Sequence, residues 1–430
     1  MAQLSADAFA FGGELMRVED ALSLVRARIP PIAKTERMPI ADADGRVLAR
    51  SLVAPIDLPI FNNSAVDGYA VAHADLNPAG TTVLPVAGRI SAGQTAEGQG
   101  ARGTAVRIFT GAPMPAGADT VFMQEDVRLL DDGRVELPSG LARGANRRVK
   151  GEDIARGDLA LAEGRCLEPR DIALIAALGL SSLEVRRRPR TAVFSTGDEI
   201  CDPGLPLAPA AIYDSNRYAL TALLRRSGCE VTDLGILRDD RDAIQASLSA
   251  ASKGHDLILT SGGVSTGEED HVRAAIAGRG SVVFWRLAIK PGRPVAMGVI
   301  RAAPRKDYAA NSGAAFVGLP GNPVAVFVTF VRVVKPLLRR LAGARPQSLV
   351  PLPVRAAFAY RKKKDRREYV RVALRRAADG EFEAVKHPQD GAGILTSLTE
   401  TDGLLEFPED VTAIEPGTRV GFLSYAALIG

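Results

Sequence analysis

The sequence predicts a multidomain α/β and β protein, with a central three-layer α/β domain, a β-rich N-terminal module and a small C-terminal β-barrel. The length of 430 residues is too great for one ordinary core, so several domains are expected. Strand-like and helix-like segments alternate in the middle of the chain, which indicates a mostly parallel sheet. On both sides of this part, short apolar runs broken by Gly and Pro are typical of β-structure.

The N-terminal region is expected to span residues 1–188 and to combine two kinds of structure. Residues 14–50 should be helical, because apolar residues recur there at helical spacing. Short β-type runs follow, and they predict an inserted β-rich module at about 70–150. A short helix with Pro near its start and Gly near its end should then form at 169–180.

The central domain is expected at 189–345. Continuous apolar runs predict buried strands, and amphipathic stretches predict the helices between them. Ligands of such sheets bind beyond the carboxyl ends of the strands. The expected strands are 191–195, 231–237, 256–260, 282–287 and 295–300, and the expected helices are 215–226, 241–252, one from about 268 and one after Pro323.

The C-terminal domain is expected at 348–430. Several short strand-like runs with Pro and Gly turns favour a small β-barrel there.

Charge and composition argue against several classes of protein. Lys and Arg number 54 against 50 Asp and Glu, and a net charge of +4 on a chain this long gives no case for nucleic-acid binding. The three cysteines lack C-x-x-C spacing, which argues against disulfides and structural zinc and fits a reducing cytoplasm. No secretory leader is expected, and the uncharged stretch 308–331 contains Gly and Pro that would break a helix in lipid. We therefore expect a cytoplasmic protein that binds neither nucleic acid nor membrane.

Three loops rich in Gly, Ser and Thr follow expected strands of the central domain. Glycine lets backbone N–H groups approach a ligand, and a following helix N-terminus favours anions. A turn with a capped helix would explain any one loop, but three in one domain favour binding of a phosphate or another oxyanion. None matches a dinucleotide fingerprint or a P-loop. The loops are 194–199 (FSTGDE), 260–270 (TSGGVSTGEED) and 318–323 (GLPGNP), and they bring Ser195, Thr196, Gly197, Ser261, Gly262 and Gly263 to the expected site.

Charged residues close to these loops suggest two further functions. Glu199 and Asp270 come just after strand-end loops, where they could share one cleft and hold Mg²⁺. Lys290 and Arg293, held between prolines, would suit an anionic substrate, although a solvated hairpin tip is the alternative. Capping of the helix at 241–252 is an alternative use of Asp239 or Asp240, and capping likewise competes with a metal role for Asp214.

Six motifs occur along the chain in this order: 63–70 (NSAVDGYA), 107–112 (RIFTGA), 194–199 (FSTGDE), 261–265 (SGGVS), 288–294 (AIKPGRP) and 318–323 (GLPGNP). Taken together, they resemble the MoeA family of molybdopterin molybdenumtransferases, whose fold also forms the C-terminal domain of gephyrin. The resemblance covers about residues 14–425, and the ordered set is far more specific than any one motif. Arg293 replaces a Lys that is common in the family, and 301–315 is longer than usual.

The resemblance implies insertion of molybdate into adenylylated molybdopterin, with hydrolysis of the phosphoanhydride and release of AMP and molybdenum cofactor. Mg²⁺ is the implied ion, and molybdate and adenylylated molybdopterin are the implied substrates. The family forms elongated homodimers whose site combines the α/β domain of one subunit with the segment around Asp67 of the other. Transient contact with a molybdopterin adenylyltransferase and with apo-molybdoenzymes would fit this role.

Residues at the family's motif positions extend the predicted site. The implied catalytic residues are Asp67, Thr110, Glu199, Asp240 and Asp270, and the implied metal ligands are Glu199, Asp239 and Asp270. Asp153 matches a further acidic position. Beyond the loop residues named above, the resemblance implies substrate contacts for Ser265, Lys290, Arg293, Pro320, Pro323, Arg366, Arg371 and Ser397.

Two other functions remain open from the sequence. A molybdopterin adenylyltransferase shares the α/β domain, but that activity resembles a lone domain of this kind rather than a chain with both flanking regions. A non-catalytic scaffold or cofactor carrier of the same fold is the second alternative. The full set of acidic residues favours chemistry over scaffolding.

Overall fold

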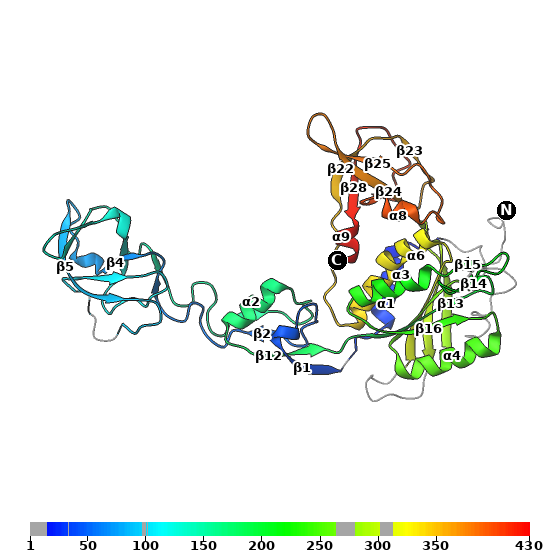
Figure 1. Ribbon diagram of the computed structural model, residues 1–430, viewed down its shortest axis with the longest axis horizontal. Helices are drawn as coiled ribbons and strands as arrows, with labels where there is room; N and C mark the ends of the chain where they lie inside the picture. The colour runs from blue at the N-terminus through cyan, green and yellow to red at the C-terminus, as the bar shows by residue number, and fades with distance from the viewer. Residues whose placement is uncertain (1–14, 33, 97–99, 101, 264–279, 302–312) are drawn as a thin grey trace.

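A computed structural model describes residues 15–32, 34–96, 100, 102–263, 280–301 and 313–430. The molecule is elongated, with a β-rich module at one end, a small connecting unit, and an α/β domain that carries a β-barrel at the other end (Figure 1). This arrangement confirms the predicted fold class. The domain boundaries predicted from the sequence stay a prediction.

The N-terminal segment is helical only over α1 (Val18–Arg28), so the expectation of helix throughout 14–50 is wrong. Ile29 precedes Pro30, and a residue before proline avoids the helical region, so the helix ends there. Helix α1 packs on α7 (Lys335–Leu341) and joins the main core of the α/β domain. A 3₁₀ turn, η2 (Ile40–Asp42), lies further along.

The connecting unit holds two short antiparallel pairs and one helix. Strand β1 (Thr35–Pro39) pairs with β12 (Ser182–Arg186), and β2 (Leu52–Val53) pairs with β11 (Leu159–Leu161). Helix α2 (Pro169–Ala177) confirms the predicted short helix, with Pro169 in its first turn and a capping box between Glu168 and Asp171.

The β-rich module is a six-stranded sheet in the order β7-β4-β6-β5-β9-β8, with an apolar cluster on each face. Next to it, β3 (Asn63–Ser64) pairs with β10 (Arg147–Arg148). The sheet strands are β4 (Gly68–Val71), β5 (Thr82–Ile90), β6 (Ala105–Ile108), β7 (Thr120–Met123), β8 (Arg128–Leu129) and β9 (Arg134–Leu137), and the 3₁₀ turns are η3 (His73–Asp75) and η4 (Gln124–Asp126).

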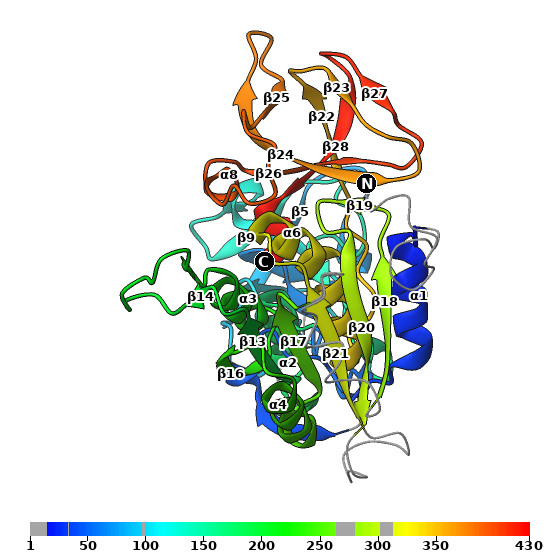
Figure 2. The ribbon, with the colours of Figure 1, turned by 90° about the vertical axis from the view of Figure 1, so that its right-hand side faces the viewer.

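The α/β domain contains a six-stranded sheet in the order β16-β13-β17-β21-β20-β18. Figure 2 shows β13, β17, β21, β20 and β18 side by side in this order. Pairing is parallel from β16 to β21 and antiparallel on both sides of β20, so the sheet is mostly parallel as predicted. The strands are β13 (Arg190–Thr196), β16 (Glu230–Leu237), β17 (Leu257–Ser261), β18 (Gly280–Arg286), β20 (Pro294–Arg301) and β21 (Gly313–Leu319), and β14 (Ile200–Cys201) pairs with β15 (Ile212–Tyr213) outside the sheet.

Helices cover both faces of this sheet, which makes the domain three-layered. Val193 faces the core cluster that includes α3, whereas its neighbour Phe194 faces the cluster under α4. This alternation explains why the strand reads as one continuous apolar run: both of its faces are buried. The helices are α3 (Asn216–Arg226), α4 (Arg241–Gly254), α6 (Pro323–Thr329) and α7, and the π-helical segment η5 (Phe330–Val334) joins α6 to α7.

The C-terminal region closes into the predicted barrel. Its strands pair in the order β24-β25-β22-β28-β26, and β26 pairs again with β24, so no strand edge in this ring is left open. A short strand of the α/β domain, β19 (Ile289–Lys290), extends the sheet beside β24. The barrel strands are β22 (Leu352–Ala356), β24 (Arg367–Arg376), β25 (Phe382–Lys386), β26 (Gly403–Phe407) and β28 (Arg419–Ser424), β23 (Tyr360–Arg361) pairs with β27 (Ala413–Ile414), and the helices are α8 (Thr396–Thr399) and α9 (Tyr425–Ile429).

No helix within the described ranges combines the length and the apolar character needed to cross a membrane.

Candidate active site

The three predicted loops meet at one edge of the α/β sheet. Strands β13, β17 and β21 are neighbours, and their parallel register sets Ser195 beside Ser261 and Ser261 beside Leu319. Their carboxyl ends therefore stop at the same level, where the ligands of open α/β sheets bind. Ser265 and Asp270 of the second loop, and the helix expected from about 268, lie outside the described residues.

Buried hydroxyl groups line this edge without partners. Ser195 is 2% exposed and Thr196 is 4% exposed, yet neither hydroxyl has a hydrogen-bond partner among the described residues. Leaving a buried polar group unpaired costs about 1–3 kcal/mol. Two such groups lie at the end of one strand, where a polar ligand could supply the missing contacts.

Glycine is favoured at two positions of this edge because both have a positive φ. Gly262 has φ +89°, and a Cβ there would lie 2.8 Å from the Thr196 carbonyl oxygen. At Gly197, with φ +140°, a Cβ would lie 2.5 Å from Glu199 Oε2. The first distance shows that the loops after β13 and β17 lie close together. The second shows that the Glu199 carboxylate folds back over its own loop.

Asn216, which no sequence motif indicated, connects two of the loops. Its Nδ2 donates to Ser261 Oγ at 2.9 Å and to the Gly321 carbonyl at 2.6 Å. Ser261 Oγ lies 3.5 Å from the Pro320 carbonyl, so the amide holds the ends of β17 and β21 together. Asn216 is the first residue of the amphipathic helix α3. A polar side chain at the start of such a helix is the sequence signal that could have indicated it.

The predicted acidic residues divide into two sets. Glu199 is exposed, and within the described part of the chain no hydrogen bond or ion pair engages its carboxylate. Asp239 follows β16, the neighbour of β13, and its backbone N–H lies 3.5 Å from Asp198 Oδ1. Asp240 caps α4, because its Oδ1 accepts from the Ala243 N–H at 2.8 Å. Asp214 likewise has a structural partner in Arg217.

The described residues contain no group of three or more His, Cys, Asp and Glu that could hold a metal ion. Glu199 and Asp239 nevertheless carry carboxylate oxygens just after two adjacent strands, β13 and β16. Mg²⁺ is commonly held by one or two carboxylates together with substrate phosphates, so this donor set fits the ion.

A second group of predicted residues lies where the α/β domain meets the barrel. Lys290 Nζ is 3.5 Å from Glu368 Oε2, and Arg366 Nε donates to Glu368 Oε1 at 2.8 Å. Burial raises the pKa of Glu368, but hydrogen bonds from Tyr360 and Arg366 and the charge of Lys290 outweigh it and leave that pKa below its usual value. The carboxylate therefore stays ionised and positions the two cations.

Arg293 lies beside this group, and less negative charge offsets the positive charge of its guanidinium. Burial, followed by the nearby charges of Arg286 and Arg366, lowers the pKa of its guanidinium. Its buried Nε has no partner among the described residues. A guanidinium crowded by other cations is a suitable position for an oxyanion.

Arg371 and Ser397 contact each other. Arg371 Nε donates to Ser397 Oγ at 3.0 Å, and its Nη2 donates to the carbonyls of Gln389 and Gly391. Most of the donors of this buried arginine therefore serve the fold of the barrel. The Ala392 carbonyl next to these turns accepts from Val324 N–H at 3.0 Å, directly after Pro323 at the start of α6.

Asp67 and Thr110 form a separate pair in the β-rich module. Asp67 Oδ1 accepts from both the backbone N–H and the hydroxyl of Thr110, each at 2.8 Å. The backbone hydrogen bond, then the hydroxyl, lowers the pKa of Asp67. Figure 1 shows this module at the opposite end of the molecule from β13, so Asp67 and Glu199 of the same chain do not lie close together. Asp153 is an exposed turn residue near the same module.

Comparison with known proteins decides the family. Family models described as "MoeA N-terminal region (domain I and II)", "Probable molybdopterin binding domain" and "MoeA C-terminal region (domain IV)" match residues 16–179, 192–340 and 353–425. The molybdopterin molybdenumtransferase of Haemophilus influenzae is 34% identical over 97% of this chain and 100% of its own length. The chain belongs to the MoeA family, an enzyme family of molybdenum cofactor biosynthesis.

Other relatives agree across nearly the full chain. A MoeA relative from Nostoc, named molybdopterin molybdenumtransferase, is 35% identical over 94% of this chain and 92% of its own length. The crystal structure of a molybdopterin biosynthesis MoeA protein from Pyrococcus horikoshii superimposes with a TM-score of 0.79 at 28% identity, covering 96% of this chain and 100% of that one. The MoeA fold therefore extends over the β-rich module, the α/β domain and the barrel together.

Proposed function

We propose that this protein inserts molybdenum from molybdate into adenylylated molybdopterin, with Mg²⁺-dependent hydrolysis of the phosphoanhydride and release of AMP. The observation that carries the proposal is the pair of buried, unpartnered hydroxyls at the end of β13. They lie within the segment that matches the probable molybdopterin binding domain.

The loops would hold the phosphates of the substrate. The Ser195 and Thr196 hydroxyls would donate hydrogen bonds to phosphate oxygens and so gain the partners that they lack in the fold. Gly262, where a side chain does not fit, keeps the neighbouring backbone open to close approach of the ligand. Asn216 would act as a positioning residue, because it holds the second and third loops in register.

Glu199 and Asp239 would hold Mg²⁺, together with Asp270 outside the described residues. When bound there, the ion would neutralise charge on the phosphoanhydride. Asp240 would act mainly through α4, which it caps. Among the described carboxylates, Glu199 would then have the most direct role in holding Mg²⁺.

The cations at the junction with the barrel would bind molybdate. Lys290 and Arg366 share the buried Glu368, which fixes their positions, and Arg293 adds a guanidinium with an unpartnered Nε. Ser397 and Arg371 would support the same pocket from the barrel. Pro320 and Pro323 would shape the loop opposite.

The working unit would be a homodimer. The separation of the Asp67–Thr110 pair from the α/β domain within one chain supports this part of the proposal, since the pair has no role at the strand ends unless a second copy supplies it. Contacts with a molybdopterin adenylyltransferase and with apo-molybdoenzymes would be transient.

The test is reconstitution with purified components. The protein is incubated with adenylylated molybdopterin, Mg²⁺ and molybdate, and AMP and active cofactor are measured. Molybdate-dependent AMP release supports the proposal. ATP-dependent adenylylation of molybdopterin without molybdate would instead identify an adenylyltransferase, and absence of both reactions would favour a scaffold or carrier.

A variant at Lys290 distinguishes the proposed molybdate-binding residues from the loops proposed to bind phosphate. Lys290→Ala should raise the molybdate concentration needed for half-maximal activity, and excess molybdate should recover part of the rate. Lys253→Ala removes an exposed lysine at the end of α4 and is the matched control. An unchanged molybdate dependence in Lys290→Ala would contradict the assigned role of this lysine.

A further inference from the structure

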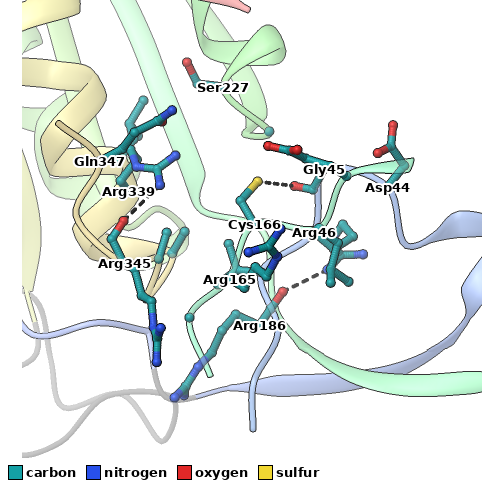
Figure 3. A pocket seen from close by; sticks show the side chains of 18 of the residues that line it. Asp44, Gly45, Arg46, Arg165, Cys166, Arg186, Ser227, Arg339, Arg345 and Gln347 are labelled. Atoms are coloured by element: carbon teal, nitrogen blue, oxygen red, sulfur yellow. Dashed lines mark hydrogen bonds between the residues drawn. The ribbon is translucent and has the colours of Figure 1, made fainter. Parts of the chain in front are cut away.

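A cavity lies at the amino edge of the α/β sheet, opposite the candidate active site. Its volume is about 780 Å³, and it is enclosed by the connecting unit, the segment before β13, the end of α3 and the α7 region. Figure 3 shows Cys166 in this cavity, with Arg339 and Arg345 on one side and Asp44 and Gly45 on the other. The seven residues of β13 separate the two sites by about 20 Å.

The side chains around the cavity are strongly cationic. Ten arginines and one lysine line it, against two acidic side chains, Asp44 and Glu168. The cations come from segments far apart in the sequence, so their convergence is a property of the fold. They are Arg46, Arg165, Arg170, Arg186, Arg187, Arg188, Arg225, Arg226, Lys335, Arg339 and Arg345.

About half of these cations already have carboxylate partners. Arg165 pairs with Asp171, Arg186 with Glu163 and Arg187 with Asp256, and these pairs fasten the connecting unit and the start of β13. Arg46 and Arg170 likewise have glutamate partners. In contrast, no side-chain carboxylate of the described residues lies within 4.0 Å of six others: Arg188, Arg225, Arg226, Lys335, Arg339 and Arg345.

Two of these six cations are held inside the wall rather than in bulk solvent. Arg339 donates from Nη2 to the Arg345 carbonyl at 2.9 Å, and its buried Nε has no partner among the described residues. Lys335 Nζ donates to the Leu428 carbonyl at 2.7 Å and to an oxygen of Gly430 at 3.5 Å. Burial, and then the charge of Arg339, lowers the pKa of the Lys335 ammonium.

Helix geometry explains part of this pattern. Arg225 and Arg226 lie in the last turn of α3, and Arg339 lies in the last turn of α7, where cations interact favourably with the carbonyl end of a helix. Helix geometry does not explain why the ends of α3 and α7 lie at the same cavity together with Arg188 and Arg345. Like charges this close repel each other, and an anion bound between them would offset that repulsion.

We propose that this cavity binds a small anion that carries two or more phosphate groups. Guanidinium groups match phosphate oxygens through paired hydrogen bonds, and several of them face the cavity from different walls. The volume is within the range of small-molecule sites. Leu159, which is 60% exposed, adds apolar surface against which a nucleoside would pack. The ligand would bridge the connecting unit and the α/β domain.

Cys166 provides a local reporter of occupancy. Its Sγ lies 3.7 Å from the Gly45 carbonyl within the cavity, whereas Cys201 lies on β14 near the other edge of the sheet. The experiment measures the alkylation rate of each cysteine by mass spectrometry with an uncharged reagent, with and without inorganic pyrophosphate, at constant ionic strength. At a ligand concentration about ten times Kd, the Cys166 rate should fall roughly tenfold, because only the unliganded fraction reacts.

Variants connect this protection to the cationic wall. Arg225→Glu combined with Arg226→Glu changes two exposed side chains and should abolish protection of Cys166. Lys253→Glu, an exposed charge reversal at the end of α4, should retain it. Unchanged melting temperature and an unchanged Cys201 rate establish that the double variant is folded.

The outcomes separate the sources of the anion. Protection by ADP at lower concentration than by pyrophosphate identifies a nucleotide, and equal protection identifies the phosphate groups alone; either result supports the proposal. Unprotected Cys166 overturns it. Equal protection in the double variant, or the same protection from sodium chloride at matched ionic strength, also overturns it.

Discussion

At the scale of single residues, the side chains of the candidate active site differ in how far the fold already engages them. The Asp240 carboxylate and the Arg371 guanidinium make hydrogen bonds that stabilise a helix end and the barrel. The Ser195 and Thr196 hydroxyls and the Glu199 carboxylate have no such partners among the described residues. Groups of the second kind can be replaced with little effect on folding, so their loss should be seen in the chemistry.

Glu199→Gln should nearly abolish AMP release. The change removes a carboxylate that would hold Mg²⁺ in the transition state, an effect of about 3–4 kcal/mol or a rate factor of roughly 10²–10³. Binding of adenylylated molybdopterin should persist, since the loop donors remain. The measurement is single-turnover AMP release together with substrate binding. Glu230→Gln, an exposed glutamate on β16, is the control, and wild-type rates in Glu199→Gln would refute the role.

The Cys166 thiol should ionise at a higher pH than a free thiol. Burial raises its pKa, and the nearby Arg339 charge partly opposes that shift by favouring the thiolate. The thiolate is therefore scarce at neutral pH, and alkylation should increase only at more alkaline pH than for N-acetylcysteine. Arg339→Gln removes the favourable charge and should move the midpoint higher still. The rate of alkylation against pH measures both, and a midpoint at or below that of the free thiol would contradict the expected shift.

At the scale of elements, three parallel strands and the start of one helix build the site. Register between β13, β17 and β21 sets the loops at one level, and α3 begins with the amide that ties two of them together. The barrel contributes through β19, which continues from the α/β domain into the barrel sheet beside β24. The phosphate side and the oxyanion side of the proposed site therefore belong to different structural units.

Asn216→Ala should destabilise the ends of β17 and β21. Two hydrogen bonds are lost, each with a net contribution of about 0.5–1.5 kcal/mol, so a loss of about 1–3 kcal/mol is expected. Hydrogen exchange of the amides in 257–261 should accelerate while exchange in the barrel stays unchanged. Ser215→Ala changes the preceding residue, whose side chain makes no capping bond, and serves as control. Equal exchange in both variants would mean that the amide does not hold the loops.

At the scale of the whole molecule, elongation has a functional consequence. The β-rich module extends far from the α/β domain of its own chain (Figure 1), and the Asp67–Thr110 pair belongs to this module. A homodimer in which each module reaches the other subunit would use this shape. The cationic cavity lies between the connecting unit and the α/β domain, where a ligand would affect how the two are joined.

Mixing an Asp67→Ala protein with a Glu199→Ala protein should restore activity. In a hybrid dimer one shared site carries both defects and the other carries neither. Random exchange of equal amounts should therefore give roughly a quarter of wild-type activity. Activity is measured after exchange has been followed by mass spectrometry of the dimer. Complete exchange without recovery would rule out a site shared between subunits.

The strand-end loops could be located from the sequence because their signals are local. An apolar run followed by Gly, Ser and Thr needs no knowledge of the partner strand, and the capping of α4 by Asp240 likewise depends on neighbours in the chain. The helix expected over 14–50 failed for a reason equally local, since Pro30 and Pro31 follow Ile29 and end α1.

By itself, the sequence determined the family, the α/β class of the middle domain and the order of its loops, because periodicity and motif order depend on positions along the chain. Only the tertiary structure decided which side chains meet. Asn216 contacts residues 45 and 105 positions away, and the arginines of the cavity are scattered from Arg46 to Arg345. Such contacts depend on strand register and on how the units pack. Proximity in space between distant segments leaves no periodic signal in either of them.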